Sequence, residues 1–269
     1  MLHEVSLRKN VIKVDLTHDY YGAEYWNKIS NRSYEPDTVS FIENQCNENV
    51  DFFDIGTANG AMSLLAAEQG AQVFAYEPDP VIYKVAERNF SLNPLLQQSI
   101  KIQNIALSAE NGTTEFGLSS DKTVLSSIVT TSGNDKNERI RIESLVDELH
   151  KFHNDQRRRL VIKMDIEGAE WKILQNEFCL EALKFHQTLL LLAVHPGFYR
   201  PFKKGFWLFN PIRYKFWQLR NYKESLNTYA MLSSKATVMR TNLNPIQRGR
   251  VFAALILVGY YEFVIDFNS

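Results

Sequence analysis

Val50-Asp-Phe-Phe-Asp-Ile-Gly-Thr-Ala-Asn-Gly60 is the stretch of sequence that decides the fold of this chain. It begins with a short apolar run, which predicts a buried strand over 50–55. A loop with Gly56 and Gly60 follows, and the apolar-rich stretch 61–69 then predicts a helix. A strand, a glycine-containing loop and a helix in this order are typical of a cofactor site on an α/β sheet.

The same alternation of strand and helix continues along the chain. Further strands are predicted at 72–76, 99–105, 160–166 and 188–194, and further helices at 80–92 and 169–177. A helix over 247–260 and a last strand over 261–267 end the pattern. Strands that alternate with helices favour an α/β fold with a mostly parallel, doubly wound sheet and right-handed crossovers.

Three segments lie outside this alternation. Residues 1–49 are interpreted as an N-terminal lead-in or cap, with a strand at 11–16 and a helix at 37–46, before a domain over 50–269. Strands at 113–118 and 139–142 flank the polar loop 132–137. Residues 197–245 are interpreted as an insertion. Within it, Phe198–Lys223 holds seven Lys or Arg, ten aromatic residues and no Asp or Glu.

The composition is that of a soluble globular protein. Of 269 residues, 45% are hydrophobic and 23% charged, and the net charge of −1 gives no reason to expect nucleic acid as a partner. Two distant cysteines argue against a disulfide framework. The N-terminus lacks a basic region followed by an apolar run, so we expect a cytoplasmic protein. The longest apolar run, 251–261, is too short to cross ~30 Å of hydrocarbon as a helix.

The glycine loop favours a cofactor without phosphates. Its spacing is Gly-x-x-x-Gly, and the middle glycine that lets a backbone approach a pyrophosphate is absent. The loop therefore argues against NAD or FAD and is compatible with S-adenosylmethionine. Asp54 would pair with the cofactor ammonium directly or through water, while Gly56 and Gly60 let the backbone pass close by. Asn59 would either contact the cofactor carboxylate or cap the following helix.

Glu77 supplies a partner for a ribose. It stands 21 residues after Gly56, at the end of the second predicted strand, where its carboxylate can accept both ribose hydroxyls. Asp79 is instead interpreted as a helix cap, because Pro80 follows it. Asn104 and Ala106 follow the third strand, where an adenine contact is expected.

A second group of charged residues lies in Val161-Ile-Lys-Met-Asp-Ile-Glu-Gly-Ala-Glu170. In a strand, Lys163, Asp165 and Glu167 would share one face. Lys163 is interpreted as part of an internal ion pair, because a buried charge needs a partner. Asp165 and Glu167 lie nearest the carboxyl end of the strand, where open α/β sheets bind ligands. His195 ends the fifth predicted strand at the same edge.

These motifs resemble those of the FkbM-type methyltransferases. The residues that carry the resemblance are Asp54–Gly60, Glu77–Pro80, Asn93, Lys163–Glu170 and Gly259-Tyr260, with Tyr34-Glu35 upstream. The resemblance covers about 34–196 and 247–267. It implies the class I Rossmann-like fold with an antiparallel C-terminal strand. It also implies S-adenosylmethionine-dependent methylation, mostly of hydroxyls on sugars and polyketide-type molecules.

Two features depart from the family pattern. The family often has a glutamate near the end of the fifth strand, where this chain has Ala193-Val-His195. The basic and aromatic segment 198–223 is not part of the pattern. Both departures concern the methyl acceptor more than the reaction.

Methyl transfer to an alcohol is helped by a general base. The hypothesis from the sequence is that His195 or Glu167 takes the hydroxyl proton and that Asp165 positions acceptor or cofactor. No metal site is predicted. The alternatives are an NAD- or nucleotide-sugar-binding Rossmann enzyme, and a non-catalytic binding module that uses the surface of 198–223.

The expected partner is a small molecule, a glycan or a lipid-linked glycan, and the oligomeric state is not predicted. Segment 198–223 has three interpretations. Its aromatic residues stack on sugars, its basic and aromatic residues contact an anionic membrane surface peripherally, or it is a core-packed helix with a solvated basic face.

Overall fold

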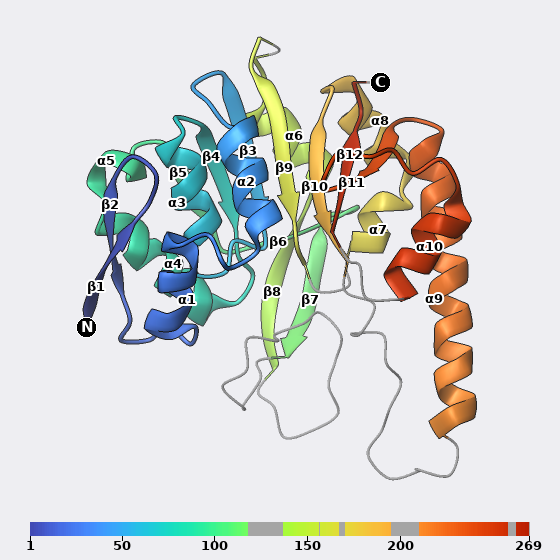
Figure 1. Ribbon diagram of the computed structural model, residues 1–269, viewed down its shortest axis with the longest axis horizontal. Helices are drawn as coiled ribbons and strands as arrows, with labels where there is room; N and C mark the ends of the chain where they lie inside the picture. The colour runs from blue at the N-terminus through green and yellow to red at the C-terminus, as the bar shows by residue number, and fades with distance from the viewer. Residues whose placement is uncertain (118–136, 156, 167–169, 195–209, 258–261, 269) are drawn as a thin grey trace.

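A seven-stranded sheet forms the centre of the protein in a computed structural model that describes residues 1–117, 137–155, 157–166, 170–194, 210–257 and 262–268 (Figure 1). Its strand order is β11-β12-β10-β9-β3-β4-β5. These strands are β3 (Val50–Ile55), β4 (Gln72–Tyr76), β5 (Ile100–Gln103), β9 (Arg159–Met164), β10 (Leu189–Ala193), β11 (Thr237–Arg240) and β12 (Glu262–Asp266). Strands β3, β4, β5, β9 and β10 run parallel to one another, and β12 pairs antiparallel with β10. The predicted, mostly parallel sheet with an antiparallel C-terminal strand is thus confirmed.

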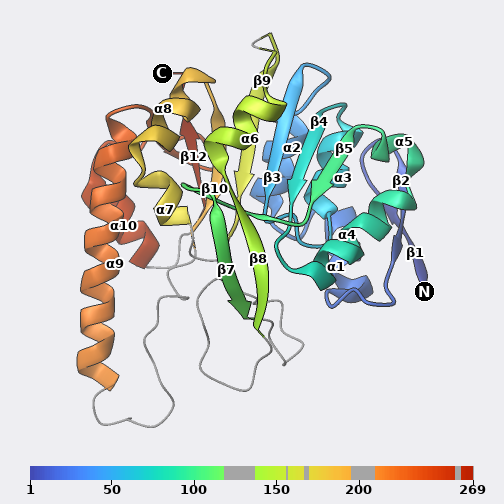
Figure 2. The ribbon, with the colours of Figure 1, turned by 180° about the vertical axis from the view of Figure 1, so that it is seen from behind.

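Helices cover both faces of this sheet (Figures 1 and 2). One face packs against α1 (Gly22–Ser30), α2 (Pro36–Gln45), α3 (Ala61–Glu68) and α4 (Pro80–Ser91). The other packs against α6 (Leu145–Phe152), α7 (Glu170–Leu174), α8 (Glu177–Phe185), α9 (Asn210–Ser233) and α10 (Gly249–Leu257). Phe52 points into the first layer and Phe53 into the second, and both are fully buried. Because both faces are covered, β3 is an unbroken buried run rather than an alternating one.

Smaller elements surround this core. A hairpin of β1 (Leu2–Ser6) and β2 (Val11–Asp15) precedes α1, and α5 (Pro94–Gln97) follows α4. A three-stranded sheet has the order β6 (Ala106–Ser108), β8 (Asn137–Ser144) and β7 (Gly112–Gly117). Within the described ranges, no helix combines the length and apolar character needed to cross a membrane.

Several boundaries differ from the sequence predictions. Strand β9 ends at Met164, so Asp165 lies just beyond the strand, where its backbone N–H still donates to the carbonyl of Ile55 (3.0 Å). The helix predicted over 169–177 corresponds to α7, which ends at Leu174, and a further helix that was not predicted, α8, follows it. Asn176 caps α8 by accepting from the backbone N–H of Cys179. Part of the segment interpreted as an insertion forms β11, an edge strand of the main sheet. The predicted loop 132–137 lies mostly outside the described residues.

The parallel strands bring their carboxyl ends to one edge of the sheet. In Figure 1 this is the lower edge, and α1 lies beside it. The residues that the sequence singled out on β3, β4 and β9 therefore lie near one another.

Candidate functional site

The loop after β3 is held tightly against the neighbouring strands. The backbone N–H groups of Gly56 and Thr57 both donate to the carbonyl of Tyr76 at 3.0 Å. Gly56 has a φ of 84°, and a Cβ at this position would lie 2.0 Å from the carbonyl oxygen of Asp165. Only glycine allows this backbone to pass so close to the end of β9.

Gly60 is required for packing as well. It precedes α3 with a φ of 87°, and a Cβ there would lie 2.5 Å from the ring of Phe90 on α4. The two glycines therefore fix the course of the loop by contacts inside the protein. Their predicted role toward a cofactor is an additional one.

Asp54 lies at the centre of the site and is fully buried. Its Oδ2 accepts hydrogen bonds from the hydroxyls of Thr57 (2.8 Å) and Ser63 (2.7 Å). Its Oδ1 accepts no hydrogen bond from the described residues and lies 3.8 Å from Nζ of Lys163. Burial raises the pKa of Asp54, and the Lys163 charge opposes that shift. A buried carboxylate oxygen with spare accepting capacity can receive an incoming N–H group.

Lys163 connects Asp54 to Asp165. Its Nζ lies 3.8 Å from Asp54 and 3.5 Å from Asp165, and its side chain is 8% exposed. Burial lowers the pKa of Lys163, but the two carboxylates outweigh this effect and the net shift is upward. The internal ion pair predicted for Lys163 is confirmed.

Glu77 follows β4 and is held by the backbone. Its Oε2 accepts from the N–H of Ala58 (3.0 Å) and its Oε1 from the N–H of Asp79 (2.9 Å). Burial raises the pKa of Glu77 to about 8. Each carboxylate oxygen has a second lone pair, so the group can accept further hydrogen bonds from a diol.

The neighbours of Glu77 fix the loop between β4 and α4. Asp79 caps α4, as predicted, by accepting from the backbone N–H groups of Val81 (2.8 Å) and Ile82 (3.2 Å). The Asn104 amide donates to the carbonyls of Glu77 and Pro78 (2.8 and 3.0 Å). Asn104 therefore holds this loop, and its predicted contact with adenine stays a prediction. Ala106, also predicted, is buried in β6.

Asn59 reveals a partner that the sequence analysis missed. Its amide donates to Oδ2 of Asp19 (3.3 Å), and its Oδ1 accepts from the N–H of Ala61 (3.4 Å). The same Asp19 oxygen accepts from Nε1 of Trp26 (2.6 Å). An aspartate shortly before a buried tryptophan was the available signal, but its contact across 40 residues is not visible in a local pattern.

The acceptor side of the site is described in part. Asp165 lies beside Lys163 at the end of β9, whereas Glu167 and His195 lie outside the described residues, so their predicted roles stay predictions. Ala193 pairs with Glu262 across the antiparallel β10–β12 ladder. Directly opposite residues in such a ladder point to the same face of the sheet. The neighbouring strand thus places a carboxylate close to where the resembling family often has a glutamate.

Glu262 belongs to a group of acidic residues that includes Asp165. Burial, together with the charges of Glu35, Asp37 and Asp165, raises the pKa of Glu262 to about 7. Asp37 is itself held by the hydroxyl of Thr241 (2.6 Å). The position of Glu262 could not be predicted from the sequence, since it depends on strand register.

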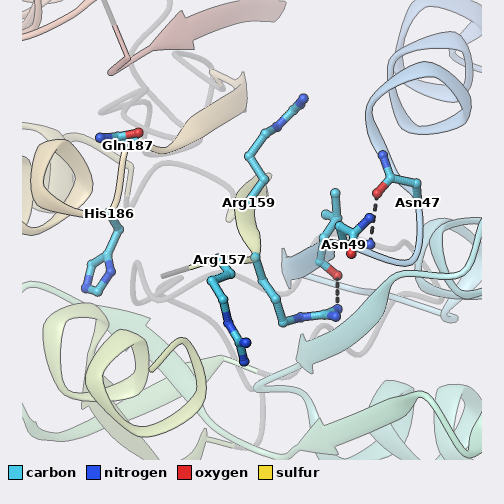
Figure 3. Close-up of a pocket in the computed structure, with 8 residues that line it drawn as sticks. Asn47, Asn49, Arg157, Arg159, His186 and Gln187 are labelled. Atoms are coloured by element: carbon cyan, nitrogen blue, oxygen red, sulfur yellow. Dashed lines mark hydrogen bonds between the residues drawn. The ribbon is translucent and has the colours of Figure 1, made fainter. Parts of the chain in front are cut away.

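A cavity of about 450 Å³ lies at the opposite edge, near the amino ends of β3 and β9 (Figure 3). It is lined by Asn47, Asn49, Val50, Arg157, Arg158, Arg159, His186 and Gln187. The arginines already have partners, Asp155 for Arg157, Asp51 for Arg158 and the Gln45 amide for Arg159. Ligands of open α/β sheets bind outside the carboxyl ends of the strands, so this cavity is not the candidate site.

Comparison with known proteins identifies the family of the chain. Residues 54–225, more than half of the chain, match the family model of the methyltransferase FkbM domain. No curated protein matches the chain.

Solved structures of low similarity are also found. A putative O-methyltransferase from Klebsiella pneumoniae is 12% identical, with 88% of this chain and 81% of that chain covered and a TM-score of 0.42. The precorrin-6y C5,15-methyltransferase from Geobacter metallireducens is 9% identical, with 87% of this chain and 82% of that chain covered and a TM-score of 0.36. The structure of aTrm5 in complex with tRNALeu is 14% identical, with 78% of this chain and 44% of that chain covered and a TM-score of 0.36.

Proposed function

Because the chain belongs to the methyltransferase FkbM family of S-adenosylmethionine-dependent enzymes, we propose that it methylates a hydroxyl of a sugar, a glycan or a similar small molecule. The observation that supports the proposal most is that Asp54, Glu77 and Asp165 lie at the same edge of the sheet. Each of these carboxylates lies at or just past the carboxyl end of a parallel strand.

The residues at this edge fit S-adenosylmethionine. Oδ1 of Asp54, which accepts no hydrogen bond from the described residues, suits the cofactor ammonium, directly or through water. Glu77 suits the ribose hydroxyls, and the backbone of the loop from Gly56 to Gly60 would face the methionine part. When bound, the cofactor supplies a methyl group on a positively charged sulfur.

On the acceptor side, the residues have to hold a hydroxyl and take its proton. We assign proton removal to His195 or Glu167 and the orientation of the acceptor or cofactor to Asp165. A positioned base typically contributes ~10²–10⁴-fold to such a step. The carboxylates of Glu35 and Glu262 near Asp165 favour an uncharged hydroxyl acceptor over an anionic one at this point.

A screen of acceptors with radiolabelled S-adenosylmethionine tests the proposal. Glycan, lipid-linked and small-hydroxyl pools are compared in wild type, His195→Ala and Glu167→Gln, with addition of EDTA as a separate arm. Label in a sugar fraction that falls in either variant supports the assignment. Wild-type turnover in both variants, with intact cofactor binding, contradicts the assigned base.

The two alternatives give different results in binding experiments. A Rossmann enzyme for dinucleotides would bind NADH in preference to S-adenosylhomocysteine. A non-catalytic module would bind the methyl donor without transferring label to any acceptor pool. We expect binding of S-adenosylhomocysteine and transfer of label.

The peripheral membrane contact of 198–223 stays a proposal, as does a cytoplasmic location. Residues 198–209 lie outside the described part of the chain, and α9 begins at Asn210. Sedimentation with anionic liposomes, with and without 198–223, tests the membrane contact. Binding that is unchanged by the deletion contradicts it.

A further inference from the structure

The segment before the first core strand docks directly on the cofactor loop. Asp19 is 8% exposed and accepts three hydrogen bonds. They come from Nε1 of Trp26 (2.6 Å), the amide of Asn59 (3.3 Å) and the backbone N–H of Tyr21 (3.0 Å). One carboxylate therefore fixes the backbone of Tyr21 to the loop that ends at Gly60. This contact joins the start of α1 to the edge of the site.

The ring of Tyr21 is supported by other aromatic rings. Its centroid lies 4.7 Å from that of Tyr25, which in turn lies 4.7 Å from Tyr34 and 5.4 Å from Trp26. Trp26 is fully buried, so the group is anchored in the core. Tyr21 itself is half-buried. An aromatic side chain held in this way has little freedom left to lose on binding.

The backbone of Tyr21 lies at the loop that carries Asn59, because the N–H of Tyr21 and the amide of Asn59 both donate to the Asp19 carboxylate. Burial raises the pKa of the Tyr21 phenol, and the charges of Glu77 and Asp165 raise it further. Glu77 follows β4 and Asp165 follows β9, and these two strands flank β3 in the sheet. These charges agree with the position that the Asp19 contacts give to Tyr21, next to the loop between β3 and α3. Figure 1 shows α1 beside this edge.

We propose that Tyr21 is a cofactor-binding residue whose ring covers the methyl-donor site from the side of α1 and contacts the sulfonium. This assignment rests on the donor site proposed above, between the ribose partner Glu77 and the reaction edge at Asp165. A cation over a tyrosine ring within ~6 Å is stabilised by the ring quadrupole. The neutral thioether of S-adenosylhomocysteine gains no such term, so the ring discriminates between donor and product.

Equilibrium binding to the full chain, measured by calorimetry, tests this assignment without an acceptor. S-adenosylmethionine and S-adenosylhomocysteine are titrated into wild type, Tyr21→Leu and Tyr21→Phe. Tyr20→Leu serves as a matched control, because Tyr20 is the adjacent residue and is 50% exposed. Thermal unfolding without ligand reports whether each variant is folded.

We expect Y21L to lose about 3- to 30-fold in affinity for S-adenosylmethionine, as a cation–π contact predicts, and clearly less for S-adenosylhomocysteine. Y21F and Y20L should stay close to wild type. The assignment would be overturned if Y21L bound each ligand with the affinity of wild type, or if Y21L lost the same factor in affinity for both ligands. If Y21L does not fold, Tyr21→Met is measured in its place and the same ratio decides. Wild type that binds neither ligand would instead show that the donor site itself is wrong.

Discussion

Replacement of Lys163 by methionine is expected to destabilise the protein by about 3–5 kcal/mol, the usual cost of breaking a buried ion pair. Lys163 is buried and is the counter-charge of Asp54, which is fully buried. The other Asp54 oxygen is bound by hydroxyls, which stabilise the carboxylate but do not neutralise it. Methionine has a similar length and no charge, so the cavity stays filled while the pair is lost.

The magnitude follows from the distances. At 3.8 Å and an effective dielectric constant of about 20, the attraction between Lys163 and Asp54 is about 4 kcal/mol. Asp165, at 3.5 Å, adds a further attraction, which solvent screens in part because 26% of its side chain is exposed. Burial already raises the pKa of Asp54, and loss of Lys163 raises it further. Protonation of Asp54 therefore removes the unpaired charge in Lys163→Met. The loss in free energy of unfolding relative to wild type should be smaller at pH 5 than at pH 8.

Urea unfolding followed by tryptophan fluorescence measures these differences. The set is wild type, Lys163→Met, Asp54→Asn, the double variant, and Lys84→Met as an exposed-lysine control. The double variant should recover more than half of the loss of Lys163→Met, since it has no uncompensated carboxylate at position 54. A loss below about 1 kcal/mol in Lys163→Met, or no recovery in the double variant, would refute the reasoning.

Three further outcomes are expected. Because burial raises the pKa of Glu77 to about 8 and the ionised carboxylate is the better acceptor for ribose hydroxyls, affinity for S-adenosylmethionine should rise from pH 6 to about 8 and then level off. Calorimetry across this range checks it, and a flat wild-type profile contradicts it. Asp79→Ala should cost about 1 kcal/mol in urea unfolding through loss of the α4 cap, with cofactor affinity within about twofold of wild type; a larger loss of affinity would give Asp79 a role in binding. Gly56→Ala should cost more than the ~1–2 kcal/mol of a left-handed alanine, because its Cβ would meet the Asp165 carbonyl at 2.0 Å. Gly112→Ala, where a Cβ meets nothing within 4 Å, is the control, and equal losses in the two variants contradict the steric argument.

The central sheet could be predicted from local sequence. The apolar run of β3 is buried on both faces, and its predicted bounds, 50–55, agree with the structure. Asp79 before Pro80 was sufficient to predict the cap of α4. These features depend on neighbouring residues, which a single sequence displays directly.

Features that depend on long-range contacts were missed. Helix α1 has only Trp26 and Ile29 as buried residues, too few for a clear helical period, and its tie to the site passes through Asp19. Glu262 faces the site because of the register between β12 and β10. Strand register and docking of a segment are tertiary properties, which local propensity does not specify.

The most direct test of the account is equilibrium binding of S-adenosylmethionine to wild type, Glu77→Ala and Arg157→Ala. Glu77 lies at the carboxyl edge of the sheet, and Arg157 lines the cavity at the opposite edge. Wild type should bind one equivalent. Glu77→Ala should lose at least about tenfold, the value of a hydrogen-bonded charge, and Arg157→Ala should bind like wild type. Unchanged binding in Glu77→Ala together with loss in Arg157→Ala would place the cofactor at the wrong edge and contradict the account.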